Sequence, residues 1–259
     1  MVSLQPVRRR TISHSDSTWW AVWRRFKNGR EKAPSHGADA PIQEASDRRR
    51  APTREEAHRT LVRDLQNLPS SGRARVVLIA NAIHGEGASS VAQDLAAALV
   101  QLQEGRVLLV DANVRSPSQH TALGVEPGPG LADFGSGIPE AERRGWSELD
   151  TGFAVLPAGL TPGDPAQLLS ERVLKNAFVE LRASFDWIIV DGPPVTIYSE
   201  ASTLSSLADG TILVLRAEST RSEVAERAAR IVTEAGGRLL GGVINRRKYH
   251  IPDFIYKHL

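Results

Sequence analysis

Two aspartates that follow short apolar runs are the residues of this chain best suited to metal chemistry. Asp111 comes directly after the run VLLV, and Asp191 comes after WIIV and is followed by Gly192 and two prolines. An acid at the carboxyl end of a parallel strand lies where open α/β sheets bind ligands. An apolar run that ends in Asp is the Walker B pattern, whose carboxylate holds Mg²⁺ directly or through water. We expect Asp111 to lie at a ligand-binding edge of the sheet and Asp191 to hold Mg²⁺; the alternatives are a capping role for Asp111 and a plain strand–loop junction at Asp191.

A second candidate site is the small-residue loop at 81–88, between an apolar run and a segment of helical periodicity. Strand, glycine loop and helix form the layout of a phosphate-binding P-loop, G-x-x-x-x-G-K-[ST], whose backbone N–H groups point at an anion. Here Ala82 replaces the first glycine and Ala88 replaces the lysine. Ser89 keeps the hydroxyl that would hold Mg²⁺. The phosphate cradle is therefore present, but its main positive charge is missing.

The elements that must position these residues alternate along the chain. Apolar runs at 76–80, 106–110, 153–157, 187–190, 211–215 and 239–244 predict buried strands, and segments of helical periodicity separate most of them. Such alternation predicts an α/β fold with a doubly wound, mostly parallel sheet. Right-handed crossovers then bring Ala82, Asp111 and Asp191 to one edge of the sheet.

Composition narrows the possible functions. The chain has 259 residues and no cysteine, which excludes disulfides and thiol catalysis, and no stretch approaches the ~18 apolar residues of a membrane span. Residues 1–60 hold 13 Lys and Arg against 7 Asp and Glu, whereas residues 61–259 hold 19 against 23. Because the basic excess lies outside the predicted core, we expect no nucleic-acid partner.

The same asymmetry predicts two parts. Residues 1–52 are rich in Arg, Ser, Pro and Ala, which is typical of a disordered basic tail, and they contain an island with Trp19, Trp20 and Trp23. Trp and Arg together suit a membrane interface or the groove of a partner, and the alternative is a patch without a fixed role. A helix with the capping box Thr53–Glu56 then opens the predicted domain, 53–259.

With these motifs in place, the chain resembles the bacterial tyrosine kinases of capsule and exopolysaccharide synthesis, which are relatives of the MinD/ParA ATPases with a deviant Walker motif. The resemblance covers residues 55–256. GEGASS at 85–90 is similar to the family's GEGKST, VLLVDANVRSP to a motif that ends in D-x-D-x-R-x-P, and FDWIIVDGPPV to FDxVIIDxPP. EAHRTL at 56–61 is similar to the start of the oligomerisation motif E-x-x-R-x-x-R.

The resemblance implies a P-loop NTPase fold of the MinD/ParA type that binds ATP or ADP with Mg²⁺. The nucleotide site that it implies consists of Gly85, Glu86, Gly87, Ala88, Ser89, Ser90 and Asn245. The implied Mg²⁺ ligands are Ser89, Asp111 and Asp191, and the implied catalytic residues of an active enzyme are Asp111, Arg115 and Asp191. Tyr249 and Tyr256 would accept phosphate, and Glu56 and Arg59 would support a homo-oligomer. The implied partner is a membrane-bound polysaccharide chain-length regulator (co-polymerase), with the protein cytoplasmic and peripheral to the inner face of the plasma membrane.

Four departures from the family pattern bear on activity. Ala88 stands at the lysine position, Asn113 at the second acid of D-x-D, and Val62 at the third oligomerisation residue, and the C-terminal tyrosine cluster is reduced to two tyrosines. The removal of one electrostatic group from such a site costs roughly 3–4 kcal/mol at the transition state. Together these changes favour a protein with impaired catalysis.

Three functions therefore stay open. The first is a pseudokinase, or nucleotide-responsive regulator, of exopolysaccharide or capsule synthesis and export. The second is an active autokinase in which Arg115 replaces the lysine and Asp111 is the base, although Arg115 could instead be a structural ion-pair partner. The third is a ParA/MinD-type positioning ATPase, which Ile83 disfavours because the signature lysine of that class would occupy its position.

Overall fold

The structure, a computed structural model, describes residues 20–22, 54–70, 74–135, 145–160 and 163–246, with side chains only from residue 59 onward. Its strands are β1 (Trp20–Val22), β2 (Arg75–Asn81), β3 (Val107–Asp111), β4 (Ser147–Glu148), β5 (Ala154–Leu156), β6 (Trp187–Asp191), β7 (Gly210–Arg216) and β8 (Leu239–Asn245). The helices are α1 (Arg54–Gln66), α2 (Ala88–Gln101), α3 (Gln119–Leu123), the 3₁₀ helix η1 (Leu131–Gly135), α5 (Pro165–Leu168), α6 (Glu171–Ser184), α7 (Glu200–Leu207) and α8 (Ser222–Glu234).

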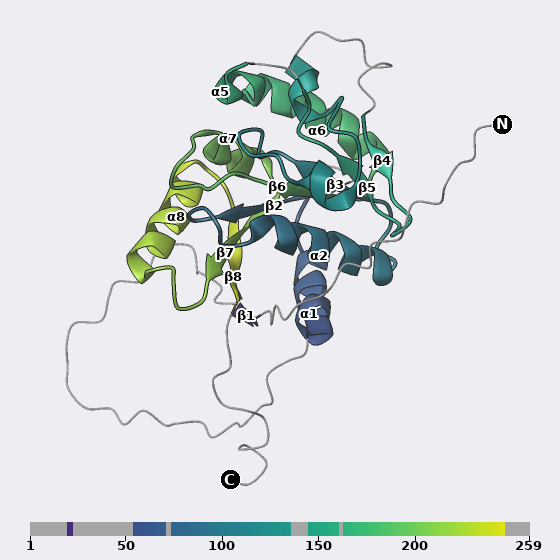
Figure 1. Cartoon of the computed structure of the whole chain (residues 1–259). Helices are drawn as coiled ribbons and strands as arrows, with labels where there is room; N and C mark the ends of the chain where they lie inside the picture. The colour runs from purple at the N-terminus through teal and green to yellow at the C-terminus, as the bar shows by residue number, and fades with distance from the viewer. Residues whose placement is uncertain (1–19, 23–53, 71–73, 136–144, 161–162, 247–259) are drawn as a thin grey trace, which may run out of the picture.

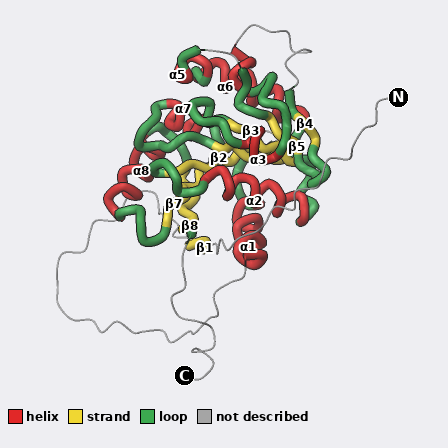
Figure 2. Tube along the Cα trace, in the orientation of Figure 1, coloured by secondary structure: helices red, strands yellow, loops and turns green. Residues whose placement is uncertain are grey.

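The strands form one sheet in the order β1-β8-β7-β2-β6-β3-β5-β4. All neighbours are parallel except the outer pairs β1–β8 and β4–β5, which are antiparallel. The central strand β2 is bracketed by β6 and β7 (Figures 1 and 2). This confirms the predicted doubly wound, mostly parallel α/β fold.

Helices cover both faces of the sheet, as Figure 1 shows, and each face has its own hydrophobic cluster. Successive residues of β2 alternate between the two clusters: Val76 and Leu78 face α6, α7 and α8, whereas Val77 and Ile79 face α1 and α2. Because parallel strands are buried on both sides, they read as continuous apolar runs, which is why these strands could be located in the sequence.

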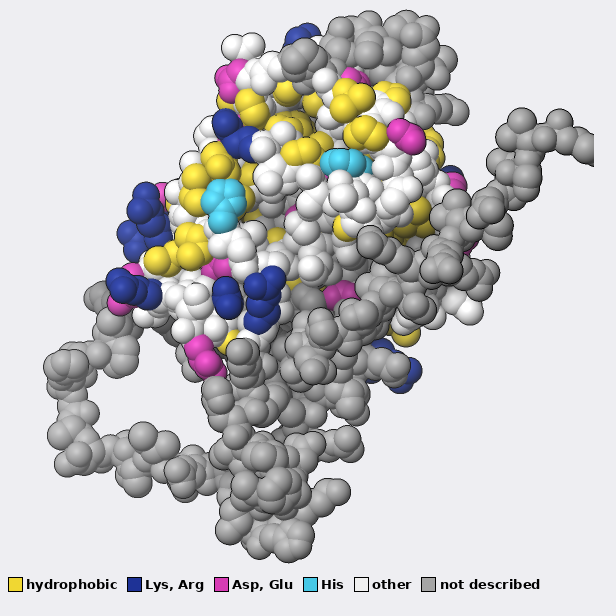
Figure 3. Space-filling view, in the orientation of Figure 1, with side chains coloured by type: hydrophobic (Ala, Val, Ile, Leu, Met, Phe, Trp, Pro, Cys, Tyr) yellow, Lys and Arg dark blue, Asp and Glu magenta, His cyan; other side chains and the backbone are white. Residues whose placement is uncertain are grey.

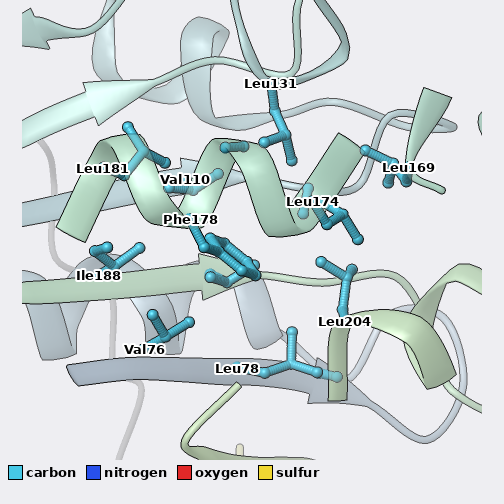
Figure 4. Packing of buried hydrophobic residues seen from close by; sticks show 14 of the residues in the cluster. Val76, Leu78, Val110, Leu131, Leu169, Leu174, Phe178, Leu181, Ile188 and Leu204 are labelled. Carbon is cyan, nitrogen blue, oxygen red and sulfur yellow. The ribbon is translucent and has the colours of Figure 1, made fainter. Parts of the chain in front are cut away.

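Helix α6 contributes more buried side chains to the first face than any other described helix. Its buried side chains recur at helical spacing, and Figure 4 shows Leu174, Phe178 and Leu181 on the side of the helix that faces the strands. Phe178 and Ile188 of β6 belong to the same hydrophobic cluster. The adjacent Val179 is 73% exposed on the outer surface of the helix.

The structure refines two expectations. The segment of helical periodicity expected between the apolar runs 153–157 and 187–190 contains two helices, because Asp164 caps α5 by accepting a hydrogen bond from Ala166 N (3.3 Å) and the extended backbone of Ser170 separates α6 from it. Within the predicted tail, residues 20–22 form β1 on the edge of β8, and the rest of 1–52 lies outside the described residues. The division at residue 53 stays a prediction.

The core assignment of α6 can be tested by truncation. We expect Phe178→Ala to lower the free energy of unfolding by about 3–5 kcal/mol, because it removes a buried aromatic ring and leaves a cavity. The matched control is Val179→Ala, one residue along, which we expect to change stability by less than about 0.5 kcal/mol. Urea unfolding followed by circular dichroism measures both, and equal effects would contradict the packing of α6.

Candidate nucleotide site

The loop between β2 and α2 has the backbone of an anion-binding P-loop. Gly85 and Gly87 have φ of 82° and 95°, a left-handed conformation that glycine adopts without strain. The side chain of Asn81, the last residue of β2, accepts a hydrogen bond from Ala88 N at 2.9 Å and so ties the start of α2 to the strand. The N–H groups of Gly85, Gly87 and Ser89 have no acceptor among the described residues. These groups, at the positive end of α2, can receive phosphate oxygens.

Glu86 shapes the loop from inside. Only 1% of this residue is exposed, and its carboxylate accepts hydrogen bonds from Ile83 N (2.8 Å) and from the Thr220 hydroxyl. Its backbone carbonyl accepts a hydrogen bond from Asn245 Nδ2 at 2.8 Å. Glu86 and Asn245 were both expected in the nucleotide site; the structure shows that their side chains fasten the loop to β8 and to the loop after β7. Contact of Asn245 with adenine stays a prediction.

The lysine position holds a small, buried side chain. Ala88 is 1% exposed in the first turn of α2, while Ser89 is partly buried and Ser90 is exposed. An alanine can donate only its backbone N–H, and that group is already bonded to Asn81. The loop therefore presents oriented amides and a serine hydroxyl without the usual ammonium group.

The two aspartates lie side by side, since Asp111 of β3 and Asp191 of β6 are paired positions of the parallel ladder. Asp111 is fully buried and accepts three backbone hydrogen bonds, from Asn113 N (3.1 Å), Ser118 N (2.9 Å) and Gln119 N (3.0 Å). Burial raises the pKa of Asp111 above its usual value, and these amides offset part of that effect. These backbone hydrogen bonds fit the alternative in which Asp111 caps the turn after β3. A role of Asp111 as a Mg²⁺ ligand or as a base stays a prediction.

Asp191 is the more promising metal ligand. Its Oδ2 accepts a hydrogen bond from Gln119 Nε2 at 2.6 Å, but its buried Oδ1 has no partner in the described part of the chain. Burial, followed by the neighbouring charge of Asp111, raises the pKa of Asp191 to about 7. Asn113 Oδ1 is also buried without a partner. Mg²⁺ prefers oxygen ligands and retains several waters, so an unpaired carboxylate oxygen beside the Ser89 hydroxyl fits this ion.

Gln119 is a site residue that the sequence reasoning missed. It is fully buried, and its Nε2 contacts both Asp191 and the carbonyl oxygen of Ser89 (3.3 Å), while its Oε1 accepts from Gln93 Nε2 at 2.7 Å. It thus links β6, the start of α2 and the loop after β3. A single glutamine belongs to no sequence motif that would mark it as functional. The only feature that could have indicated Gln119 is its position two residues after VRSP.

Arg115 is committed to an ion pair. Its guanidinium contacts Glu200 Oε1 at 2.6 Å, and the Glu200 side chain is only 2% exposed. The guanidinium also lies 4.8 Å from the ring centroid of Tyr198, whose hydroxyl is 3.2 Å from His84 Nε2. The ion-pair interpretation of Arg115 accounts for these contacts, and its role as a substitute cation stays a prediction.

Several predicted functional residues cannot be placed in the site. Tyr249 and Tyr256 lie outside the described residues, as does the side chain of Glu56. Arg59 is exposed on α1. No group of three or more His, Asp or Glu side chains that could hold a metal occurs in the described ranges, and none of the described helices is long and apolar enough to cross a membrane.

A glycine loop between β2 and α2, with an acid at the end of the adjacent strand β6, defines a P-loop nucleotide-binding protein. The model of the family described as "Cellulose biosynthesis protein BcsQ" matches residues 76–232. Tyrosine-protein kinase YwqD of Bacillus subtilis is 32% identical over 193 residues, which cover 74% of this chain and 81% of that protein. The chain therefore belongs to the family of BcsQ-like P-loop proteins that includes the bacterial tyrosine-protein kinases.

Solved structures support the same fold. The kinase domain of Escherichia coli tyrosine kinase ETK superposes with a TM-score of 0.67 at 23% identity and covers 77% of this chain and 80% of that one. Cobyrinic acid a,c-diamide synthase from Mycobacterium smegmatis, with bound ATP analog and magnesium, has a TM-score of 0.56 at 25% identity and covers 65% and 73%.

The raised pKa of Asp191 predicts a pH-dependent stability of the metal-free protein. The folded state holds the proton more tightly than the unfolded state, whose pKa is near 3.8, so this residue's contribution is fully present below about pH 4 and is lost as the pH rises to about 7. We therefore expect Asp191→Asn to be more stable than the wild type by about 4 kcal/mol at pH 8, with the difference shrinking towards pH 4.

Chemical denaturation between pH 4 and pH 8 in the presence of a chelator measures this difference. The exposed Asp150→Asn is the matched control, and we expect its curve to run parallel to that of the wild type. A constant offset between Asp191→Asn and the wild type across this range would contradict the prediction.

Proposed function

We propose that this protein is a tyrosine-kinase-like P-loop protein that regulates exopolysaccharide or capsule synthesis and export, and that its catalysis is impaired. The observation that carries the proposal is that one site keeps the groups that bind phosphate and Mg²⁺ but lacks the lysine that phosphoryl transfer uses. The loop amides are free and Asp191 Oδ1 is unpaired, yet the lysine position is the buried Ala88. Nucleotide binding needs the first two features, whereas fast phosphoryl transfer also needs charge close to the transferring group.

In this proposal ATP or ADP binds with Mg²⁺, more weakly than at a complete P-loop. The amides of Gly85, Gly87 and Ser89 would receive the phosphates, and Asp191 with the Ser89 hydroxyl would hold the ion. When bound, the ion would neutralise part of the negative charge of the phosphates. Magnesium beside an ATP analog in the cobyrinic acid a,c-diamide synthase structure supports this choice of ion.

The partner we propose is a membrane-bound polysaccharide chain-length regulator. The protein would then work in the cytoplasm at the inner face of the plasma membrane, as a homo-oligomer that uses α1. Support comes from the resemblance of residues 56–61 to an oligomerisation motif and from the basic, Trp-containing segment 1–52. The output would be an assembly state set by the bound nucleotide.

An active autokinase is the second candidate, because the relative YwqD is named a tyrosine-protein kinase. Asp111 would then accept the proton of a tyrosine hydroxyl. Its three backbone hydrogen bonds leave little freedom for that role, which is why we place it second.

Calorimetry of the full chain with ATP and ADP, with and without Mg²⁺, tests the proposal. We expect Mg²⁺-dependent binding that Ala88→Lys tightens by about 10-fold or more, because a charged donor to phosphate is worth 1.5–3 kcal/mol. Ala88→Met, which adds length without charge, is the matched control and should not tighten binding. Binding by neither the wild type nor Ala88→Lys would refute a nucleotide-dependent function.

Phosphotyrosine formation separates the two candidates. After incubation with ATP we expect Tyr249 and Tyr256 to be phosphorylated at least 10-fold faster in Ala88→Lys than in the wild type, by the same electrostatic argument. Mass spectrometry measures the modification, and Asp191→Ala is the inactive control. Equal rates in the wild type and in Ala88→Lys would favour the active autokinase.

A further inference from the structure

We propose that Arg246, reaching the P-loop from the end of β8, supplies the positive charge for nucleotide phosphates that Ala88 lacks. The inference rests on the nucleotide binding proposed above. It assigns the charge to a residue that follows Ala88 by 158 positions and comes directly after β8. In this arrangement the cation approaches the phosphates from the β8 side of the loop instead of from α2.

The first support is proximity. Arg246 Nε lies 4.0 Å from the position that a Cβ would take on Gly87, the glycine directly before α2. The charged part of the guanidinium begins at this nitrogen. It is therefore next to the loop whose N–H groups are free.

The second support is that the base of this side chain is fixed. Asn245, directly before Arg246, donates to the carbonyl oxygen of Glu86, and its backbone oxygen accepts a hydrogen bond from Ala217 N (2.8 Å). Asn245 Oδ1 accepts from Arg246 N at 2.7 Å. Arg246 itself has φ of 59°, a conformation that few residues other than glycine adopt, and it turns the chain directly after the strand.

The third support is the balance of charge. Arg115 is neutralised by Glu200, whereas the guanidinium of Arg246 has no carboxylate partner among the described residues. The carboxylate of Glu86 accepts hydrogen bonds from Ile83 N and from the Thr220 hydroxyl, and it forms no ion pair with Arg246 in the described part of the chain. A cation next to the positive end of a helix is repelled weakly at an exposed position such as that of Arg246, and an anion bound between them would turn this repulsion into attraction for both.

An independent observation, an unpaired buried carboxylate oxygen, points to a charged ligand at the same loop. Asp191 Oδ1 is buried without a partner near Ser89, as a site for a phosphate-bound Mg²⁺ would require. A guanidinium suits the remaining phosphate oxygens because its planar donors can bond two of them at once. The view in Figure 3 has the orientation of Figure 1. Most of the Lys and Arg side chains visible in it lie at the left, where Figure 1 labels α8.

The test compares Arg246→Gln and Arg246→Lys with the wild-type full chain. The probes are ADP with Mg²⁺ and pyrophosphate, which has no base. Calorimetry should show that Arg246→Gln binds both probes about 10- to 100-fold more weakly, and that Arg246→Lys keeps most of the affinity. Ala88→Lys added to Arg246→Gln should restore binding.

Arg238→Gln is the matched control, because Arg238 is an exposed arginine just before the other end of β8. We expect it to bind both probes as the wild type does. Thermal unfolding of each variant checks that the fold is unchanged. The loss of ADP binding with unchanged pyrophosphate binding would assign Arg246 to the base and overturn the proposal.

Two further outcomes separate this inference from the proposed function. Unchanged binding of both probes by Arg246→Gln would overturn the role of Arg246 and leave nucleotide binding in place. A wild-type protein that binds neither probe would overturn both.

Discussion

The burial of two neighbouring carboxylates is the constraint on which the rest of this structure depends. Asp111 and Asp191 occupy paired positions of β3 and β6, where water cannot reach them. Two adjacent buried negative charges repel each other, so the chain must supply donors or keep a proton. The loop after β3 supplies them: its backbone amides surround Asp111, and Gln119 reaches across to Asp191. One oxygen of Asp191 stays unpaired, and a divalent cation would satisfy it.

The P-loop in this chain is held by polar side chains instead of by a lysine. Asn81 bonds the first amide of α2, Glu86 bonds inside the loop, and Asn245 ties the loop to β8. Such a loop keeps its shape without a ligand. The loss of a lysine therefore need not destroy the site, because the backbone geometry that receives phosphate has separate supports.

The fold could be predicted because its signals are local. Val76–Ala80 and the runs before Asp111 and Asp191 are continuous apolar stretches, and each is a strand in the structure. The P-loop and the two acids could be found for the same reason, since each is a short motif at the end of such a run. The location of the two acids at one edge of the sheet also followed from the common direction of parallel strands, but their pairing on neighbouring strands did not.

The contacts that finish the site could not be predicted, because they join residues that are far apart in the chain. Glu86 and Asn245 are 159 positions apart, and Gln119 and Asp191 are 72 apart. Arg115 is the opposite case. Because Arg115 lies in a recognised motif, the sequence suggested that it could replace the missing lysine. In the structure its charge is paired with the carboxylate of Glu200 in α7, 85 positions away. Pairing of this kind depends on the packing of whole elements, which spacing along one strand does not report.

The antiparallel strands at the two ends of the sheet have a consequence for association. β1 has three residues and β4 has two, and they flank six parallel strands. A long strand at the border of a sheet offers unpaired backbone groups to any passing chain, which is a common start of aggregation. Short border strands give such a chain little to pair with. In the described part of the sheet, the border strands β1 and β4 themselves therefore offer a second chain only three and two residues for pairing.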